Sequence, residues 1–492
     1  MTTLAPHRSL LLLLGAALAW RLALAFVIVP GRGYATDLGL FWQWATSLAQ
    51  HGSGTFYAST GSANYPPGYL YVLWALGLTG EPALLKLPAI LADIGIGAVL
   101  YALALRWRGP RTGLVAAALF LFLPVSWYDS ALWGQVDAVG TLVAVVALLL
   151  LAEGWSEAAL ATAVLAVLVK PQYAIGLGVV IPVLVRRHLL RPGTGPRPVL
   201  GRVTGSLDHA LGGLLADQGP RRLASSAVLA GVLGIMVLLP FDLARYAAPS
   251  LADLPVIGQV AGLAGLFGRL GSEFTVLTAN AFNPWALAGT PPLAQTLAGG
   301  GSWWIADSTI IAGGLPAVTI GAGALVAVGL LVAGGLLVRD GLVPILLGFT
   351  VLALAFFVLP TRVHERYLFP FFATASVLAA PSAVRVAGLA ALNLLAAVNL
   401  HAILAGNVFT TGSGGGAGGG RPGAFGGGFG GGFGGAGYTA IQLPLGDVAR
   451  SEAAVTLVAL TLGLSLVVLV GAWIRLVARG SPGVSLPASP TG

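Results

Sequence analysis

The chain has 492 residues, of which 57% are hydrophobic and 9% are Asp, Glu, Lys or Arg, and its formal net charge is +8. Soluble proteins carry about 25% charged residues, so this composition excludes a water-soluble surface. The sequence has no cysteine, which excludes disulfides, cysteine nucleophiles and cysteine-ligated metals. Most arginines form short clusters between hydrophobic runs, where they set membrane orientation, so DNA binding is excluded as well.

Apolar runs of about 20 residues recur along the chain and predict an all-α, polytopic integral membrane protein. The first run is too long for a signal-peptide core and is expected to be an uncleaved helix. Basic clusters favour the cytoplasm, which fixes the direction of each crossing. In the first half of the chain, spans are expected near residues 9–29, 83–105, 112–127, 138–152, 157–170 and 172–186.

The stretch 66–80 is also apolar, but a crossing here would place arginine clusters on opposite faces of the membrane. We therefore expect an interfacial helix on the outer face. Its Tyr69, Tyr71 and Trp74 agree with this position, because amphipathic rings favour the headgroup level.

The second half of the chain continues the alternation. Further spans are expected near residues 224–240, 310–338, 341–359, 367–381, 384–404 and 452–474. The total is about twelve spans. We expect a multi-pass protein of the inner (cytoplasmic) membrane with both termini in the cytoplasm.

Loops and composition divide the chain into three parts. Glycine contributes no side chain to a core, so the GGGF repeats at 411–437 predict a flexible outer loop. We favour a tolerated insertion here over a segment that binds lipid or acceptor. The parts are a transmembrane catalytic module at 1–404 (outer loops 30–82 and 241–309, basic cytoplasmic loop 186–223), the Gly-rich outer loop at 405–451, and a final helix with a cytoplasmic tail at 452–492.

Ionisable residues at membrane depth or at helix mouths are costly, and they are therefore candidate site residues. The expected topology places two lysines, Lys86 and Lys170, near outer helix ends, against the usual inside bias of basic residues. This placement indicates an anionic ligand. The residues that gather at the outer face are Asp37, Lys86, Asp129, Asp137, Lys170, His364, Glu365 and Arg366.

Carboxylates, a histidine and several cations at an outer face fit sugar transfer from a lipid-linked phosphate donor. A carboxylate takes the proton of an acceptor hydroxyl as it attacks the anomeric carbon, and cations stabilise the departing phosphate. We expect Asp37 to be the general base. The candidate phosphate contacts are Lys86, Lys170, His364 and Arg366. No cofactor or metal is required, because charge neutralisation serves this leaving group.

The same residues carry a family resemblance. An aspartate after the first span, followed in order by ANYPPGYLYVLWALG, LLKLPAILAD, SALWGQVDA, LVKPQ and VHERYLFP, resembles the GT-C superfamily of polytopic glycosyltransferases. The similarity is closest to bacterial proteins similar to the second mannosyltransferase of GPI-anchor synthesis. It spans residues 10 to about 380. The Gly-rich loop and the last helix lie outside it.

Membership of this family implies a site on the extracytoplasmic face, a polyprenyl-phosphate donor, inversion at the anomeric carbon and Asp37 as base. The sugar would be mannose or another hexose, and the acceptor would be a lipid, glycan or protein. Substrate contacts are expected from Tyr65, Asp129, Trp133, Gln135, Asp137 and Glu365, because amides and indoles offer hydrogen bonds and a stacking face for sugar.

Each candidate also has a structural alternative. Asp37 could cap a helix that begins at Leu38, and Asp137 could cap the span that it starts. His364, Glu365 and Arg366 could form a local salt bridge at an interfacial helix start.

Two charged residues lie deeper in the expected spans. Arg21 is expected to snorkel or to pair with a carboxylate, and Asp93 to pair within the bundle. The rival function is a transporter or lipid flippase, in which the same charges would line a substrate pathway. Two features argue against it: the charges cluster at one face instead of the midplane, and no inverted repeat is evident.

Overall fold

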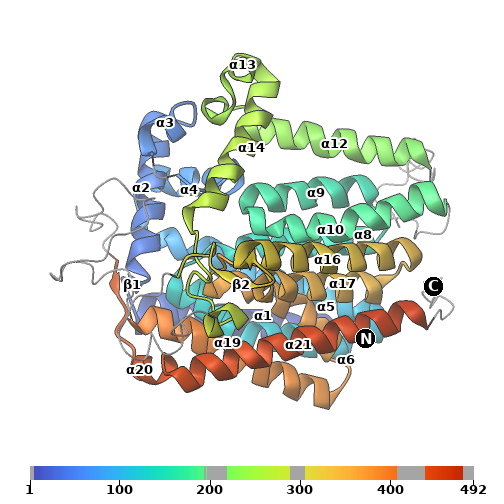
Figure 1. Cartoon of the computed structure of the whole chain (residues 1–492). Helices are drawn as coiled ribbons and strands as arrows, with labels where there is room; N and C mark the ends of the chain where they lie inside the picture. The colour runs from blue at the N-terminus through green and yellow to red at the C-terminus, as the bar shows by residue number, and fades with distance from the viewer. Residues whose placement is uncertain are drawn as a thin grey trace.

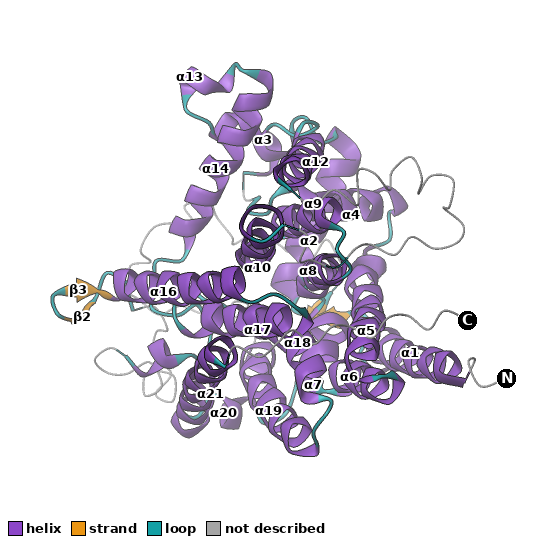
Figure 2. Cartoon of the chain, turned by 90° about the vertical axis from the view of Figure 1, so that its right-hand side faces the viewer, coloured by secondary structure: helices purple, strands orange, loops and turns teal. Residues whose placement is uncertain are grey.

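The computed structural model describes residues 5–61, 63–192, 196, 219–288, 305–406 and 438–479. Long helices run side by side, and short helices and irregular segments cover one end of them (Figure 1). Figure 2 shows many of the same helices nearly end-on, packed as one bundle. The fold is therefore helical, as the sequence predicts.

Helices lie at all twelve expected spans. They are α1 (Ala5–Ala23), α5 (Leu87–Arg108), α6 (Pro110–Phe122), α8 (Asp137–Ala152), α9 (Ser156–Val169), α10 (Ala174–Val185), α12 (Pro220–Leu238), α16 (Ala317–Val338), α17 (Leu342–Val358), α18 (Phe369–Ala379), α19 (Ala383–Gly406) and α21 (Glu452–Ala478). Several of them, including α5, α6 and α12, begin at or next to proline, whose fixed φ and missing N–H suit the first turn.

By length and composition, seven helices among the described residues can cross a membrane. An eighth is added if α6 and its continuation to Trp133, bent by 48°, count as one broken span. Helices α8, α9 and α17 are apolar but only 14 to 17 residues long. The chain thus has the helices of a multi-pass membrane protein, and the count of twelve spans stays a prediction.

Shorter elements join the long helices. On the first half of the chain they are η1 (Leu24–Ile28), β1 (Arg32–Gly33), α2 (Ala35–His51), α3 (Phe56–Thr60), α4 (Pro67–Thr79), η2 (Pro82–Lys86), α7 (Pro124–Trp127), η3 (Tyr128–Trp133), η4 (Pro171–Tyr173) and η5 (Arg186–Leu190). On the second half they are η7 (Leu243–Tyr246), α13 (Pro249–Ala252), α14 (Pro255–Glu273), η8 (Pro284–Leu287), β2 (Ile310–Ala312), β3 (Leu315–Pro316), η9 (Glu365–Leu368), β4 (Thr439–Ala440) and α20 (Gly446–Ala449). The strands form two small sheets, a parallel β1–β4 pair and an antiparallel β2–β3 pair.

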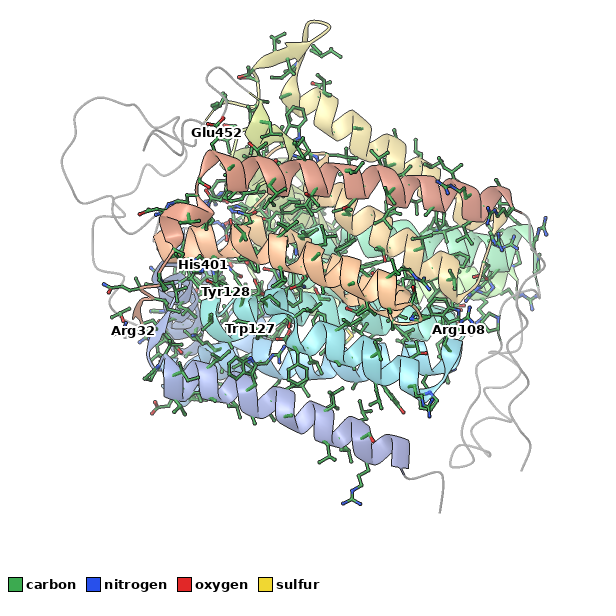
Figure 3. All side chains as sticks on the ribbon, turned by 90° about the horizontal axis from the view of Figure 1, so that it is seen from below. Arg32, Arg108, Trp127, Tyr128, His401 and Glu452 are labelled. Atoms are coloured by element: carbon green, nitrogen blue, oxygen red, sulfur yellow. The ribbon has the colours of Figure 1, made fainter. Side chains whose placement is uncertain are left out.

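The two ends of the bundle differ in their charged contacts. At one end, ion pairs join arginines to neighbouring helices: Arg106 to Glu153, Arg187 to Asp340 and Arg222 to Glu157. The start of α1 and the end of α21 lie at this end in Figure 1. Figure 3 shows Arg108 here, far from Arg32 and His401 at the other end. This grouping agrees with the expected alternation of crossings, while the side of the membrane stays a prediction.

The helix expected at the interface is present as α4, but its aromatic residues are placed differently. Tyr69 is 1% exposed and packs on Phe41 of α2, with ring centroids 5.6 Å apart. The Tyr71 hydroxyl donates to the Val237 carbonyl oxygen at 3.1 Å. The expectation that Tyr69 faces the headgroups is therefore wrong, because α2 covers it. The headgroup position of Tyr71 stays a prediction. Gly77 allows the close approach, since a Cβ there would collide with the Ala45 carbonyl.

The second expected outer loop, 241–309, contains α13 and α14. Trp285 is anchored by its indole N–H, which donates to the Leu359 carbonyl oxygen at 2.7 Å. Parts of four expected segments lie outside the described residues: 193–195 and 197–218 of the basic loop, 289–304 of this outer loop, the Gly-rich repeats at 411–437, and 480–492 of the tail.

Candidate active site

The bent span ends in the π-helical turn η3, a kind of irregularity that is frequent at functional sites. The backbone carbonyl of Asp129 accepts from the N–H groups of Gly134 and Gln135, both at 3.0 Å. Gly134 has φ of +90°, which a residue with a Cβ rarely adopts. The WGQVD motif thus forms a tight turn between η3 and α8.

This turn holds the carboxylate of Asp37. Asp37 Oδ2 accepts from Trp133 Nε1 at 2.9 Å and from Gln135 Nε2 at 2.5 Å. Helix α2 begins at Ala35, and no side chain caps it. The capping alternative for Asp37 is therefore wrong. Among the described residues, Oδ1 has no hydrogen-bond partner and the side chain is only half-buried, so it is open to a substrate.

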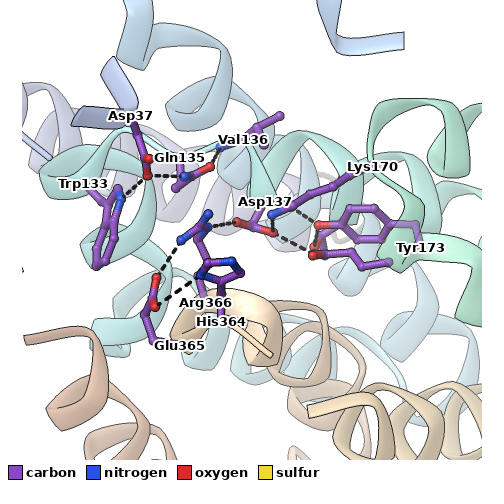
Figure 4. A network of polar contacts seen from close by, with 12 residues as sticks. Asp37, Trp133, Gln135, Val136, Asp137, Lys170, Tyr173, His364, Glu365 and Arg366 are labelled. Atoms are coloured by element: carbon purple, nitrogen blue, oxygen red, sulfur yellow. Dashed lines mark hydrogen bonds and ion pairs between the residues drawn. The ribbon is translucent and has the colours of Figure 1, made fainter. Parts of the chain in front are cut away.

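Asp137 lies close by as the first residue of α8 and is fully buried. Its Oδ1 accepts from Lys170 Nζ at 2.8 Å and from Gln172 Nε2 at 2.7 Å, and its backbone carbonyl accepts from the Tyr173 hydroxyl. Figure 4 shows Lys170 and Tyr173 converging on Asp137 from one side. Lys170 also lies over the ring of Tyr367, 4.7 Å from its centroid. Two of the motifs quoted from the sequence, SALWGQVDA and LVKPQ, are thus in direct contact.

The third part of the site is HERY, on η9. Arg366 Nη1 donates to Glu365 Oε1 at 2.7 Å, and its Nε lies 3.7 Å from Asp137 Oδ2 without a hydrogen bond. The guanidinium carbon is 6.0 Å from the centroid of the Trp133 ring. Arg366 therefore joins the Asp37 group to the Asp137 group (Figure 4). The local salt bridge with Glu365 is present, but it is only one of the contacts of Arg366.

His364 is the least suited of the expected phosphate contacts. Burial, and then the charges of Arg366 and Lys170, lower the pKa of His364 well below its ordinary value. The imidazole is therefore neutral, and its Nδ1 has no hydrogen-bond partner. It can offer a hydrogen bond to a ligand but not a charge, and its expected contact with the donor phosphate stays a prediction.

Asp129 faces a small cavity between η3, η9, α18 and α19. The cavity is lined by Asp129, Glu365 and Arg366 together with apolar side chains and has room for about one water molecule. Both carboxylate oxygens of Asp129 are buried without a partner. Asp129 thus shares this small cavity with Arg366 and is fully buried. The Asp129 carboxylate would have to become accessible before it could contact a sugar.

Lys86 has a different role from the one expected. It is 0% exposed, and its Nζ donates to the carbonyls of Arg32 at 2.6 Å, Ala131 at 2.7 Å and Leu132 at 3.0 Å. An ammonium group has three N–H donors, so none is left for a phosphate. This geometry contradicts the assignment of Lys86 to the donor phosphate. Lys86 instead joins β1 to η3.

Arg21 and Asp93 form the buried pair that the sequence suggests. Arg21 Nε lies 2.7 Å from Asp93 Oδ2, and Ser130 donates to the same oxygen at 2.6 Å. Both charged side chains are fully buried. This pair lies within the bundle, and Ser130 of η3 connects it to the segment that carries Asp129.

Sequence reasoning missed two aromatic residues of the site. The ring of Tyr34 lies 4.6 Å from that of Trp133, and burial, followed by the charges of Asp37 and Glu365, raises the pKa of Tyr34 well above its ordinary value. Tyr367 stacks near His364, with centroids 5.3 Å apart. Both could have been suspected because they flank Asp37 and Arg366 in the chain. Tyr65, an expected substrate contact, is 9% exposed and packs on Phe41 at the edge of this cluster.

Within the described ranges, no three histidine or acidic side chains are grouped so as to hold a metal ion. The expectation that no metal is required stays a prediction.

No protein-family model matches the chain. No curated protein matches it either. Among solved structures, the chain is similar to the archaeal oligosaccharyltransferase AglB from Archaeoglobus fulgidus in complex with an inhibitory peptide and a dolichol-phosphate, with 15% identity and a TM-score of 0.40 over 96% of this chain. The chain spans a little over half, 56%, of the length of that protein. A similarity of this size is too low to show a family, so the GT-C resemblance and its narrower GPI-mannosyltransferase form stay hypotheses.

Proposed function

We propose that the chain is an inverting membrane glycosyltransferase that moves a sugar, mannose or another hexose, from a polyprenyl-phosphate donor to an extracytoplasmic acceptor. The observation that carries the proposal is the arrangement around Trp133. Its indole N–H fixes the half-buried Asp37 carboxylate, and its ring lies 6.0 Å from the guanidinium carbon of Arg366. A base and a cation thus share one supporting residue.

The base suits the attacking acceptor hydroxyl, and the cation suits the departing phosphate, in a displacement at the anomeric carbon. Asp37 Oδ1 accepts the proton of the acceptor hydroxyl while that oxygen bonds to the anomeric carbon. The bond from the anomeric carbon to the phosphate oxygen breaks on the opposite face. Lys170 and Arg366 stabilise the phosphate that leaves with the electron pair. The anomeric configuration inverts because a single displacement takes place.

The location of the site supports the expected sidedness. Asp37, Asp137 and Arg366 each lie near the start of a helix. Figure 3 places Arg32, just before α2, at the end of the bundle opposite Arg108. Basic clusters favour the cytoplasm, so the site would face outward. A transporter would instead place such charges near the midplane of the membrane.

The test is transfer by the purified protein in proteoliposomes. Labelled polyprenyl-phosphate hexoses, a polyprenyl-diphosphate sugar and a nucleotide sugar would be offered separately with membrane acceptors. Transfer from a polyprenyl-phosphate hexose alone supports the proposal. Movement of labelled lipid between leaflets without a new glycosidic bond would favour the flippase instead.

A further inference from the structure

We infer that Asn64 and Glu273 form a subsite for hexose hydroxyls at the rim of the candidate active site. This inference rests on the proposed function and adds a specificity-determining pair to it. Asn64 lies in the first outer segment, and Glu273 is the last residue of α14. Neither residue is explained by the base or by the phosphate contacts.

The two side chains already meet. Asn64 Nδ2 donates to Glu273 Oε2 at 3.1 Å, and the Asn64 side-chain carbonyl oxygen is buried without a partner. Burial raises the pKa of Glu273. An amide and a carboxylate side by side offer both donors and acceptors. This combination suits neighbouring hydroxyls of a hexose, each of which donates and accepts.

An aromatic residue follows each member of the pair in the chain. Tyr65 follows Asn64 and lies against Phe41. Phe274 follows Glu273, and its ring is 4.7 Å from His364. Polar side chains with aromatic neighbours are typical of small-molecule sites. We expect Asn64 and Glu273 to bind hydroxyls at the edge of a hexose.

The pair also adjoins the phosphate end of the site. His364 contacts Tyr367, whose ring lies under Lys170 at 4.7 Å from the Nζ atom. Glu273 also interacts electrostatically with Tyr367, so a hexose bound by the pair would lie on the side of the site where Tyr367 contacts Lys170. Asn64 and Glu273 could bind the hydroxyls of either a donor sugar or an acceptor sugar. Separate kinetic measurements for the two substrates distinguish these cases.

A purely structural tether is the alternative, but other contacts already fasten these segments. Asp242 accepts from the backbone N–H groups of Tyr57 and Ala58 at 2.9 and 2.8 Å. Arg269 of α14 donates to the Gly61 carbonyl oxygen at 2.8 Å. Loss of one further hydrogen bond should therefore leave the loop in place.

The experiment compares Glu273→Gln and Asn64→Ala with Asp253→Asn, an exposed carboxylate next to α14 that serves as the matched control. Donor and acceptor concentrations are varied separately. We expect each test variant to raise the KM of the sugar substrate that occupies the subsite by about tenfold to hundredfold, with kcat nearly unchanged. Discrimination against deoxyhexose analogues should fall in parallel. Kinetics and selectivity like those of Asp253→Asn in both variants would overturn the inference.

A second measurement separates this inference from the proposed function. Methyl hexosides are added to the purified protein, and thermal unfolding is followed. Saturable stabilisation that is lost in Glu273→Gln but kept in Asp253→Asn supports the subsite even if the protein transfers no sugar. Absence of any hexoside effect, together with unchanged selectivity, overturns the subsite while leaving sugar transfer intact. Asn64→Ala gives the same two readouts if Glu273→Gln fails to fold.

Discussion

Two of the buried charge clusters in the described part of the chain, those around Arg21 and Arg366, differ in how fully their polar atoms are paired. Around Arg21, every nitrogen of the guanidinium donates: Nε to Asp93, Nη1 to the Ala17 carbonyl, and Nη2 to the Leu121 carbonyl and the Ser126 hydroxyl. In the cluster around Arg366, two ion-pair contacts are longer than a hydrogen bond, and buried atoms of five residues have no hydrogen-bond partner. They belong to Asp129, Asp137, His364, Glu365 and Arg366.

The difference separates a structural cluster from a binding cluster. A buried polar atom without a partner is costly, so native proteins rarely keep several together unless water, an ion or a ligand completes them. In the Arg21 cluster, Asp93 Oδ1 has no hydrogen-bond partner, but every guanidinium nitrogen of Arg21 already donates. The Arg366 cluster retains both donors and acceptors at the mouth of the bundle. Substitutions in the two clusters should therefore affect different measurements.

The largest effect is expected at Asp37. Asn retains an oxygen that can accept from Trp133 and Gln135, but a neutral amide cannot take a proton. For Asp37→Asn, we expect transfer to fall by about two to four orders of magnitude with an unchanged unfolding temperature. Turnover is measured at matched protein level in proteoliposomes. Near-normal turnover would exclude Asp37 as base and make Asp129 or Asp137 the next candidates.

Substitutions in the Arg21 cluster should instead affect the stability of the protein. Arg21→Met leaves Asp93 buried without its counter-charge, and loss of one partner of a buried pair costs about 3–5 kcal/mol. We expect a large fall in unfolding temperature and unchanged specific activity of the protein that remains folded. The double variant Arg21→Met with Asp93→Leu should recover part of the lost stability. A selective loss of donor use in Arg21→Met would contradict the distinction between the clusters.

Neutral substitutions in the Arg366 cluster should weaken donor binding. Lys170→Met and Arg366→Gln each remove charged hydrogen bonds to the proposed phosphate, worth about 1.5–3 kcal/mol. The donor KM should rise accordingly, and binding of polyprenyl phosphate should weaken in a direct titration. Glu452→Gln, at the start of α21, is the control for a charge change at the same end of the bundle. Unchanged donor dependence in both test variants would remove these residues from the site.

Much of this arrangement could be predicted because hydrophobic periodicity and arginine clusters depend on local sequence. The twelve helical segments follow from such patterns. The ion pair of Asp137 with Lys170, in contrast, joins two helix ends that meet only in the fold. The error at Lys86 has a different origin. Lys86 lies at a helix end, as expected. The direction of its side chain, however, is set by carbonyls of β1 and η3, which come close to it only in the folded chain.

The partners of Glu273 were likewise invisible in the sequence. It lies 209 positions from Asn64 in the chain, and no short motif links the two residues. The neutrality of His364 depends on burial and on neighbouring cations, which composition does not report. Sequence reasoning therefore located the ends of helices well and the directions of their side chains poorly.

The smallest effect concerns Lys86. It lies at the same end of the bundle as the candidate site, but its ammonium group is fully hydrogen-bonded, like the guanidinium of Arg21. Lys86→Met keeps the length of the side chain and removes donors to three carbonyls, some of which water can then satisfy. We expect a loss of about 1–2 kcal/mol in stability and an unchanged donor KM. Unfolding in detergent and donor kinetics measure the two quantities. A raised donor KM at full stability would restore Lys86 to the phosphate site. The location of a charged residue at the site end of the bundle would then predict its function better than the pairing of its polar atoms.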